Sequence, residues 1–307
     1  MSLTKKILRY PIVVAKCWWR GGIGGVVHDA VATLRQHLEI DQIDERIRSL
    51  ERRNQSVLPV TSTWVLMSWV EHAALERTPL VSVIMPTYNR SRVLPNAIES
   101  VRKQAYGCWE IVVTDDGSND DTPEVLYDLT RTLGSDRLRV IRTSRAGVCA
   151  ARNRALENAR GEFIVYLDDD NIMHPLWIKA VVWAFSQRPG ADVIYGGIVI
   201  DDMRRMNGTA SGDLPAYYLN TFDRTRLLKD NLADIGQIAH RRGLLEARFD
   251  ETLGGLGDWD LLLRLTREKE PFVIPALACL YSTSATDRMS VDPSFQIEAA
   301  QVRERAR

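Results

Sequence analysis

The sequence predicts an α/β fold with a mostly parallel central sheet and helices on both faces. From residue 80 onward, short apolar segments of strand length alternate with segments in which apolar residues recur at helical spacing. Strands that alternate with helices pair in parallel, and a parallel sheet is covered on both faces. Polar residues cluster where several of these strands end. Ligands of such sheets bind beyond the carboxyl ends of the strands, so these clusters are the first candidates for function.

The expected elements alternate regularly along the chain. They are a strand at 81–85, a helix at 91–105, a strand at 109–113, a helix at 122–133, a strand at 138–141, a helix at 148–159 and a strand at 162–167. The first helix places Leu94, Ile98 and Val101 on one face, which is the spacing of an amphipathic helix. We expect Pro86 to end the first strand, because proline cannot donate a backbone hydrogen bond to a sheet.

Composition limits the classes of function. The 307 residues include 40 Lys and Arg and 40 Asp and Glu, so the formal net charge is zero. This balance argues against bulk electrostatic binding to nucleic acid, and we expect no nucleic-acid partner. The sequence has no run of 18 apolar residues, which is the length that a spanning helix needs. The four cysteines form no C-x-x-C pair, which is typical of thiols in a reducing compartment.

Residues 1–79 are expected to form a basic, helical extension to the α/β domain. Its first part, residues 1–28, carries five basic side chains and no acidic one, with Trp18 and Trp19 among apolar residues. Basic charge together with tryptophan is typical of a segment that lies on an anionic membrane surface. The alternative is an element that packs against the main domain. We therefore expect a cytoplasmic protein, with peripheral contact to the inner face of the cell membrane if residues 1–28 bind it.

A further helix is expected at residues 26–53. Its apolar stripe, spaced by three and four residues among alternating charges, consists of Ile40, Ile43, Ile47 and Leu50. A stripe of this length either joins two copies of the chain as a homodimer or packs on the chain's own domain. We place the domain boundary at Pro79, directly before the first strand.

Three adjacent aspartates, Asp168, Asp169 and Asp170, follow the last of these strands. Adjacent carboxylates repel one another, so ending a buried strand with them is costly unless a cation neutralises them. Oxygen ligands at a loop suit Mg²⁺ or Mn²⁺, ions that also bind substrate phosphates. The alternative is an acidic turn that caps the next helix, with Asp170 or Asn171 as the cap.

A second polar segment, 115–122 (DDGSNDDT), follows the strand at 109–113. By itself it reads as a turn with aspartate and serine helix caps. Its position at the same predicted sheet edge as the three aspartates favours a functional interpretation. An aspartate there, such as Asp116, can accept hydrogen bonds from a base or a ribose.

The third polar segment, 86–90 (PTYNR), follows the first strand. Tyr88 offers a flat face on which a base could stack. Thr87 and Asn89 offer small polar groups beside it. Taken alone, this segment is an ordinary turn from a strand to a helix.

Taken together, these segments resemble the successive motifs of glycosyltransferase family 2. The motifs are 81–90 (VSVIMPTYNR), 111–118 (IVVTDDGS), 151–153 (ARN), 166–170 (YLDDD), 249–251 (FDE) and 257–265 (GDWDLLLRL). The resemblance covers residues 80–285. Each motif is weak alone, but their order and their positions at strand ends and turns make the combination specific.

The resemblance implies a GT-A fold and transfer of a sugar from a nucleotide diphosphate sugar. It implies that the nucleotide sugar binds to Pro86, Thr87, Tyr88, Asn89, Asp116, Arg152, Asp168 and Asp169. The acidic run resembles the family's D-x-D motif, which makes Asp170, with Asp168, the expected ligand of Mn²⁺ or Mg²⁺. Arg152 matches the family's A-R-N motif, and it either contacts the nucleotide or pairs with an acidic loop.

Asp258 lies at the position of the family's catalytic base. Many members have Glu-Asp there, whereas this chain has Gly257 before Asp258, so a neighbour that would tune the base is missing. Without the resemblance, Asp258 would be interpreted as a helix N-cap. A single base that takes a proton from the acceptor hydroxyl, opposite the departing diphosphate, predicts inversion at the anomeric carbon.

We therefore expect a metal-dependent inverting glycosyltransferase. Its acceptor would be a hydroxyl of a carbohydrate, a lipid-linked sugar or another molecule, in the synthesis of surface polysaccharide or glycoconjugate. Residues 80–200 would bind the donor and 201–290 the acceptor, with 291–307 as a C-terminal tail. One alternative is a non-catalytic nucleotide-sugar-binding protein. A weaker one is a sugar nucleotidyltransferase, because segment 86–90 lacks the glycine-rich loop that such enzymes need.

Overall fold

The computed structural model describes residues 57–201, 216–282 and 295–305. Contacts between residues divide the chain into two units, Met1–Ala73 and Ala74–Arg307. The described part of the first unit contains helix α4 (Val57–His72). The predictions for residues 1–28 and 26–53 lie outside the described residues, and the boundaries expected after residues 79, 200 and 290 stay predictions. Within the described residues, no helix is long and apolar enough to cross a bilayer.

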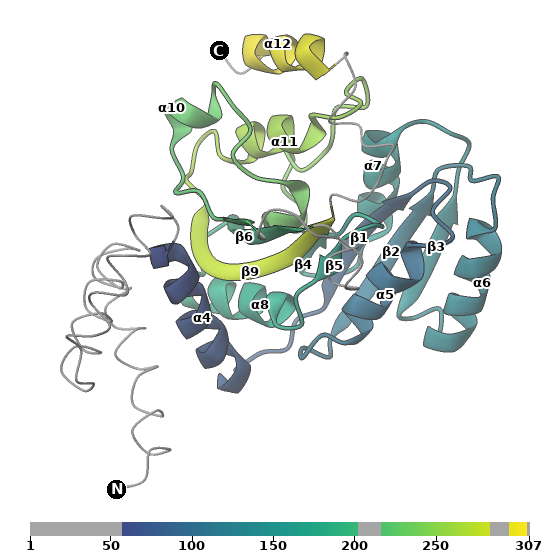
Figure 1. Cartoon of the computed structure of the whole chain (residues 1–307), viewed down its shortest axis with the longest axis horizontal. Coiled ribbons are helices and arrows are strands. Elements are labelled where there is room, and N and C mark those ends of the chain that lie inside the picture. The colour runs from purple at the N-terminus through teal and green to yellow at the C-terminus, as the bar shows by residue number, and fades with distance from the viewer. Residues whose placement is uncertain (1–56, 202–215, 283–294, 306–307) are drawn as a thin grey trace, which may run out of the picture. The chain divides into compact units, whose positions relative to one another are not determined.

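The second unit is built on one nine-stranded sheet (Figure 1). Four strands pair in parallel in the order β3 (Leu138–Arg142), β2 (Trp109–Asp115), β1 (Val81–Thr87) and β4 (Phe163–Tyr166). The sheet continues with β8 (Ile238–Arg241), β6 (Val193–Asp201), β9 (Phe272–Ser282) and β5 (Ile172–Met173), and β7 (Ala216–Tyr218) pairs with β6. Strands β6 and β9 are parallel, whereas β8, β5 and β7 run antiparallel to their neighbours.

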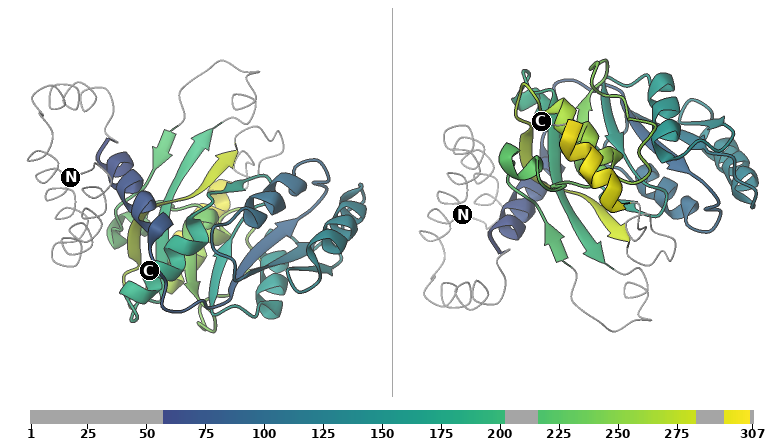
Figure 2. Two further views of the ribbon diagram at one scale, coloured as in Figure 1. Left: turned by 90° about the horizontal axis from the view of Figure 1, so that it is seen from below. Right: turned by 90° about the horizontal axis from the view of Figure 1, so that it is seen from above.

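Helices cover both faces of this sheet. The described helices of this unit are α5 (Leu94–Arg102), α6 (Thr122–Leu133), α7 (Val148–Asn158), α8 (Trp177–Gln187), α10 (Arg224–Leu227), α11 (Gly257–Leu265) and α12 (Phe295–Arg305), with a 3₁₀ turn η1 (Ile235–Gln237). Figure 1 shows α7 and α11 above the sheet and α5 and α8 below it, and Figure 2 shows the two faces from below and from above. The predicted α/β class with helices on both faces is confirmed.

The end of β1 differs from the sequence prediction. Pro86 does not end the strand but pairs with Thr114 inside it. Ile84, two residues earlier and therefore facing the same neighbour, accepts from Leu167 on the β4 side at 3.1 Å. Strand β4 has ended at Tyr166, so opposite Pro86 there is no further β4 residue to pair with. The missing N–H of proline therefore leaves no ladder bond unmade.

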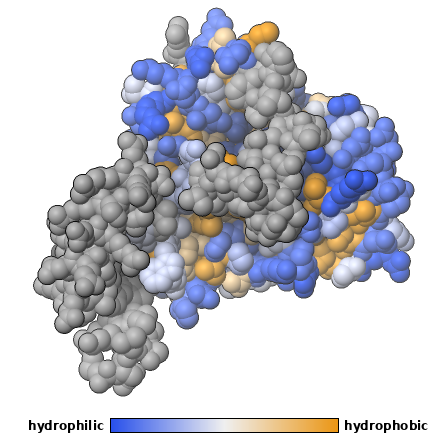
Figure 3. All heavy atoms as spheres, viewed as in Figure 1, coloured by the Kyte–Doolittle hydropathy of each residue, from blue (hydrophilic) through white to orange (hydrophobic). Residues whose placement is uncertain are grey.

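One apolar core joins the parallel strands to α11 and α12. Ile84 and Tyr166 lie in the same buried cluster as Trp259, Leu262 and Val302. Burying side chains of this size stabilises a fold by about 1.5–3 kcal/mol each. On the face that Figure 3 shows, hydrophilic side chains predominate over the described surface, and apolar residues form smaller patches. The packing thus places α11, which carries Asp258, firmly against the sheet.

Candidate active site

The carboxyl ends of β1, β2 and β4 meet at one edge of the sheet. Thr87 pairs with Asp115 at the ends of β1 and β2, and the Asp116 N–H donates to the Thr87 carbonyl at 2.9 Å. On the other side of β1, the Leu167 N–H donates to the Ile84 carbonyl. This hydrogen bond extends the β1–β4 pairing to the residue directly before Asp168. The polar segments that follow these three strands therefore lie together.

Asn89 fixes the turn after β1. Its backbone has φ of 54°, in the left-handed region that asparagine tolerates better than most residues. Its N–H donates to Ser118 Oγ at 2.9 Å, and its side-chain oxygen accepts from the Asn119 N–H at 2.9 Å. The side chain predicted to bind the nucleotide sugar thus ties the loop after β1 to the loop after β2.

Asp116 and Tyr88 are both engaged by the loop that precedes α7. The two Asp116 carboxylate oxygens accept from the N–H groups of Ala146 and Gly147, each at 2.8 Å. The Arg145 guanidinium carbon lies 4.2 Å from the centre of the Tyr88 ring, and the group donates to the Tyr88 hydroxyl at 3.2 Å. Arg145 therefore covers one face of the ring on which a base is expected to stack.

Arg152 lies on α7 and pairs with the first aspartate of the acidic run. Its Nη2 donates to Asp168 Oδ1 at 2.7 Å, and the Arg152 side chain is only 7 % exposed. Of the two alternatives for this arginine, the structure contains the pairing with the acidic loop. The buried Arg152 Nε has no hydrogen-bond partner among the described residues.

Asp169, the second aspartate of the run, points into the protein. It is buried, and its Oδ1 lies 3.6 Å from Arg90 Nε. Burial, together with the negative charge of Asp170, raises the pKa of Asp169 to about 7. The Thr87 hydroxyl and the positive charge of Arg90 lower this pKa and so limit the rise. Asp168 and Asp170 stay half-exposed on either side of it. The acidic run does not cap the next helix, because α8 starts after Leu176 without a side-chain cap.

Asp258 lies in the first turn of α11, where the charges of Arg152 and Asp168 act on it; these residues are called the acidic cluster. The helix N-cap is Leu256, so Asp258 is not the cap. Its Oδ2 accepts from Asn231 Nδ2 at 3.0 Å and its Oδ1 from the Trp259 N–H at 2.7 Å. Burial raises the pKa of Asp258 to about 6, while the charge of Arg152 opposes the rise. A carboxylate with this pKa can take a proton near neutral pH.

The residue before Asp258 has no room for a side chain. A Cβ at Gly257 would lie 2.5 Å from Cys149 Sγ and 3.2 Å from the ring of Phe249. Cys149 is buried on α7. The glutamate that many family members carry at this position therefore does not fit here while Cys149 keeps its place.

Asp234 belongs to the cluster, although sequence reasoning missed it. It precedes η1, and its Oδ1 accepts from the Gly236 N–H at 2.9 Å. Burial and the charges of Asp168 and Asp258 raise the pKa of Asp234. The only local signal is a capping-box spacing with Gln237, which by itself indicates a helix start rather than a functional site.

Asn153 connects two of the recognised motifs. Its Nδ2 donates to the Phe249 carbonyl at 2.9 Å and to Glu251 Oε1 at 2.8 Å. Its Oδ1 accepts from the Phe249 N–H at 2.8 Å. The asparagine of the ARN motif thus anchors the FDE segment next to Arg152, a contact that the sequence alone did not predict.

The acidic edge offers two half-exposed carboxylates to a divalent cation. Among the described residues, no three His, Cys, Asp or Glu side chains are arranged to hold a metal ion by themselves. Mg²⁺ and Mn²⁺, however, commonly take one or two protein carboxylates and complete their shell with water and substrate phosphates. The half-exposed Asp168 and Asp170 fit a site of that open kind.

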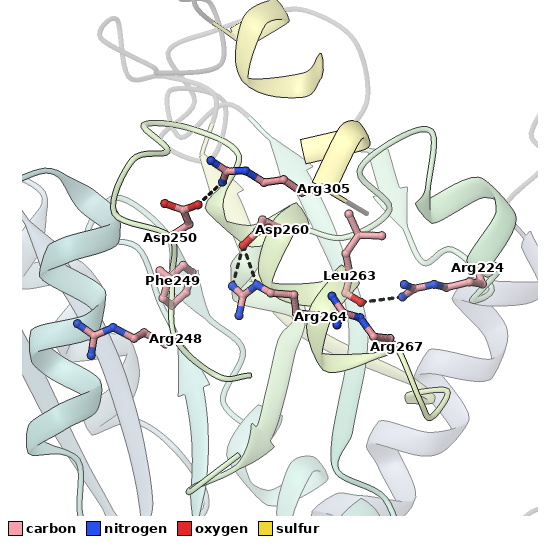
Figure 4. Close-up of a pocket in the computed structure, with 9 residues that line it drawn as sticks. All are labelled: Arg224, Arg248, Phe249, Asp250, Asp260, Leu263, Arg264, Arg267 and Arg305. Carbon is pink, nitrogen blue, oxygen red and sulfur yellow. Dashed lines mark hydrogen bonds and ion pairs between the residues drawn. The ribbon is translucent and has the colours of Figure 1, made fainter. Parts of the chain in front are cut away.

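A separate pocket of about 380 Å³ lies along α11 and contains none of the predicted site residues (Figure 4). Asp260 pairs with Arg264 there, Arg305 pairs with Asp250, and Arg224 donates to the Leu263 carbonyl. Most of its charged groups are thus engaged with one another, and the acidic cluster around Asp258 remains the best candidate for the active site.

Comparison with known proteins identifies the family. The family model described as "Glycosyl transferase family 2" matches residues 82–249. The chain belongs to glycosyltransferase family 2. It is 32% identical over 207 residues to the PGL/p-HBAD biosynthesis glycosyltransferase Rv2957 of Mycobacterium tuberculosis (strain ATCC 25618 / H37Rv), covering 66% of this chain and 73% of that protein. It is 34% identical over 223 residues to the uncharacterized protein y4gI of Sinorhizobium fredii (strain NBRC 101917 / NGR234), covering 69% of this chain but only 23% of that protein.

Solved structures share the fold. Staphylococcus aureus TarS 1–349 in complex with UDP-GlcNAc aligns with a TM-score of 0.60 at 20% identity, over 74% of this chain and 66% of that chain. The mannosyltransferase PcManGT of Pyrobaculum calidifontis, in complex with GDP-Man and Mn²⁺, aligns with a TM-score of 0.53 at 21% identity, over 79% of this chain and 68% of that chain. The predicted GT-A type of fold is confirmed.

Proposed function

We propose that this glycosyltransferase transfers a sugar from a nucleotide diphosphate sugar to an acceptor hydroxyl with inversion. One observation carries the proposal. Asp258 is held by Asn231 and the Trp259 N–H in the same acidic cluster as Arg152 and Asp168, at the sheet edge where β1, β2 and β4 end. The proposed base Asp258, the guanidinium of Arg152 and the carboxylate of Asp168, which is proposed to bind the donor, therefore lie in one cluster.

For the donor, we propose a nucleotide diphosphate sugar bound by the segments after β1, β2 and β4. The proposed contacts are Pro86, Thr87, Tyr88, Asn89, Asp116, Arg152, Asp168 and Asp169. Support comes from the solved structures of the same fold, which hold UDP-GlcNAc or GDP-Man. Asp116 and Asn89 also fix the loops that border this site, since their side-chain oxygens accept backbone N–H groups.

For the cofactor, we propose Mn²⁺ or Mg²⁺, held by Asp170 with Asp168. The ion, when bound, neutralises charge on the departing nucleotide diphosphate. The mannosyltransferase of the same fold contains Mn²⁺. Arg152 pairs with Asp168 and so holds this carboxylate in place at the proposed site.

As the base, we propose Asp258. At neutral pH a carboxyl with a pKa of about 6 is mostly ionised, and it can accept the proton of an attacking hydroxyl. Because a single carboxylate activates the acceptor, the acceptor attacks opposite the leaving diphosphate and the anomeric configuration inverts. Asn231 stabilises the ionised form by donating to it, and Arg152 does so through its charge.

The acceptor is proposed by analogy with the relatives. Rv2957 is named for the biosynthesis of a glycoconjugate, and the WcaA protein of Escherichia coli (strain K12) is named as a putative colanic acid biosynthesis glycosyl transferase. We therefore propose a carbohydrate or lipid-linked hydroxyl acceptor in surface polysaccharide or glycoconjugate synthesis. Membrane contact through residues 1–28, a cytoplasmic location and a homodimer through residues 26–53 stay proposals. Vesicle co-sedimentation of the full chain tests the membrane contact, light scattering tests the homodimer, and cell fractionation tests the location.

The deciding experiment is a donor screen with the full chain. Nucleotide diphosphate sugars are tested by thermal shift with Mn²⁺, with Mg²⁺ and with EDTA, and the donors that stabilise the chain are then assayed for transfer. The product's anomeric configuration is read by NMR. We expect Asp258→Asn to abolish transfer and to retain donor binding, and the exposed Asp121→Asn to behave as wild type. Donor binding without turnover would instead favour the non-catalytic alternative.

A further inference from the structure

Helix α12 packs against the start of α11, the helix that carries Asp258 (Figures 1 and 2). Ala299 and Val302 on α12 are buried in the same apolar cluster as Leu256 and Trp259. The last described helix of the chain thus contacts Leu256, two residues before the proposed base, and Trp259, directly after it. Its polar contacts decide what this packing does.

Glu298 on α12 binds the loop from which α11 starts. Its Oε1 accepts from the Gly254 N–H at 2.9 Å, and its Oε2 accepts from Gly255 at 2.9 Å and from Leu256 at 3.2 Å. Three consecutive backbone amides therefore converge on one carboxylate. A Cβ at Gly254 would lie 2.9 Å from Glu298 Oε1, so a glycine permits this approach. Two glycines also make the loop costly to order without such a partner.

Arg303 on the same helix binds the segment that carries Asn231. Its Nε donates to the Lys229 carbonyl at 2.8 Å, and its guanidinium carbon lies 5.3 Å from the centre of the Trp259 ring. Glu298 and Arg303, five residues apart on α12, thus hold both chain segments that determine the direction of the Asp258 carboxylate. Near the end of α12, Arg305 pairs with Asp250 and so joins the helix to the FDE segment at 249–251 (Figure 4).

We propose that Glu298 is a positioning residue for the Asp258 base, acting through the loop at 254–256. It does so from α12, a helix that follows the whole sheet in sequence. The proposal rests on the proposed function, because Asp258 is the base only within it. Core packing holds the helix itself, whereas the Glu298 carboxylate binds the backbone amides of the loop that leads into it.

Two measurements on the full chain test this role. Hydrogen exchange of the amides at 254–256 is compared between wild type and Glu298→Ala, without any substrate, and transfer kinetics are compared with the donor identified in the screen. We expect exchange at these amides to be about 10-fold faster in Glu298→Ala, because the loop then opens locally. We expect kcat to fall by about 10-fold or more with donor KM within about twofold, because small misplacement of a base is costly.

Matched variants separate positioning from general stability. Glu304→Ala removes an exposed glutamate from the same helix and should match wild type in both measurements. Glu298→Gln keeps one acceptor oxygen and should fall between wild type and Glu298→Ala. The proposal is overturned if Glu298→Ala shows the same amide exchange at 254–256 as wild type, or the same kcat as wild type. If wild type transfers no sugar from any donor, the proposed function fails, while exchange still decides whether Glu298 holds the loop.

Discussion

Arg152 donates to Asp168 across 2.7 Å, and this ion pair ties α7 to the end of β4. The Arg152 charge also lowers the pKa of Asp258 on α11 and of Asp234 before η1, against the effect of burial. One buried guanidinium therefore balances carboxylates that come from three separate parts of the chain. The donor site and the base are electrostatically linked through it.

Removing this cation should destabilise the fold. Arg152→Gln leaves Asp168, Asp234 and Asp258 without their counter-charge, and breaking a buried pair costs about 3–5 kcal/mol when the remaining charge stays buried. We expect a loss of about 2–4 kcal/mol at pH 7.5 because Asp168 is partly exposed. Urea unfolding measures it. The exposed neighbour Arg154→Gln should lose under about 0.5 kcal/mol, and an equal loss in both variants would contradict this role for Arg152.

Asp258→Asn should stabilise the protein at neutral pH. The pKa of Asp258 in the folded chain is about 6, above that of an unfolded aspartate near 3.9, so its ionisation opposes folding. The unfavourable contribution is fully present above about pH 7 and disappears as the pH falls through 6 towards 4. We expect Asp258→Asn to gain about 1–2 kcal/mol at pH 7.5 and to match wild type near pH 4. Unfolding curves at both pH values measure this, and a pH-independent difference would exclude the assigned cause.

Asn231 should set the acidic limb of the pH profile. Its Nδ2 donates to Asp258 Oδ2 at 3.0 Å and so favours the ionised carboxylate. In Asn231→Leu, the pKa of Asp258 should rise, and the acidic limb of kcat/KM should move to higher pH. Initial rates between pH 5 and 9 would reveal the shift. Asn96→Leu, at an exposed position on α5, is the control and should leave the limb in place.

Local patterns predicted much of this fold because its parallel strands are short, buried and bounded by turns. The strands between residues 81 and 167 and the polar residues that follow them were placed by hydrophobic spacing alone. Pro86 was misjudged because the local rule ignores the neighbouring strand, which ends before it could pair there. An isolated rule about proline cannot contain that information.

The site itself was predictable only where a motif marks a strand end. Asp234 lies in a turn between elements, and its membership in the cluster depends on tertiary packing against Asp168 and Asp258. The same holds for Glu298, whose three partners lie far earlier in the chain. Pairings between distant segments leave no periodic signal, so sequence spacing could not reveal them.

Gly257 and Cys149 form a pair whose coupling can be measured. Alanine normally favours a helix over glycine by about 0.5–1 kcal/mol. At Gly257, however, the added Cβ would lie 2.5 Å from Cys149 Sγ, and overpacking of this kind costs about 1–3 kcal/mol. We therefore expect Gly257→Ala to destabilise the wild-type chain, as measured by urea unfolding.

In a Cys149→Ala background Gly257→Ala should be much less destabilising. Without the sulfur, the Cβ at Gly257 keeps only the Phe249 ring at 3.2 Å as a near neighbour, a contact that a small movement of the ring relieves. The coupling energy from this double-mutant cycle should reach about 1–2 kcal/mol. Gly107→Ala, where an added Cβ meets nothing within 4 Å, should show no coupling to Cys149. Additive effects of Gly257→Ala and Cys149→Ala would mean that the sulfur is not what keeps this position a glycine.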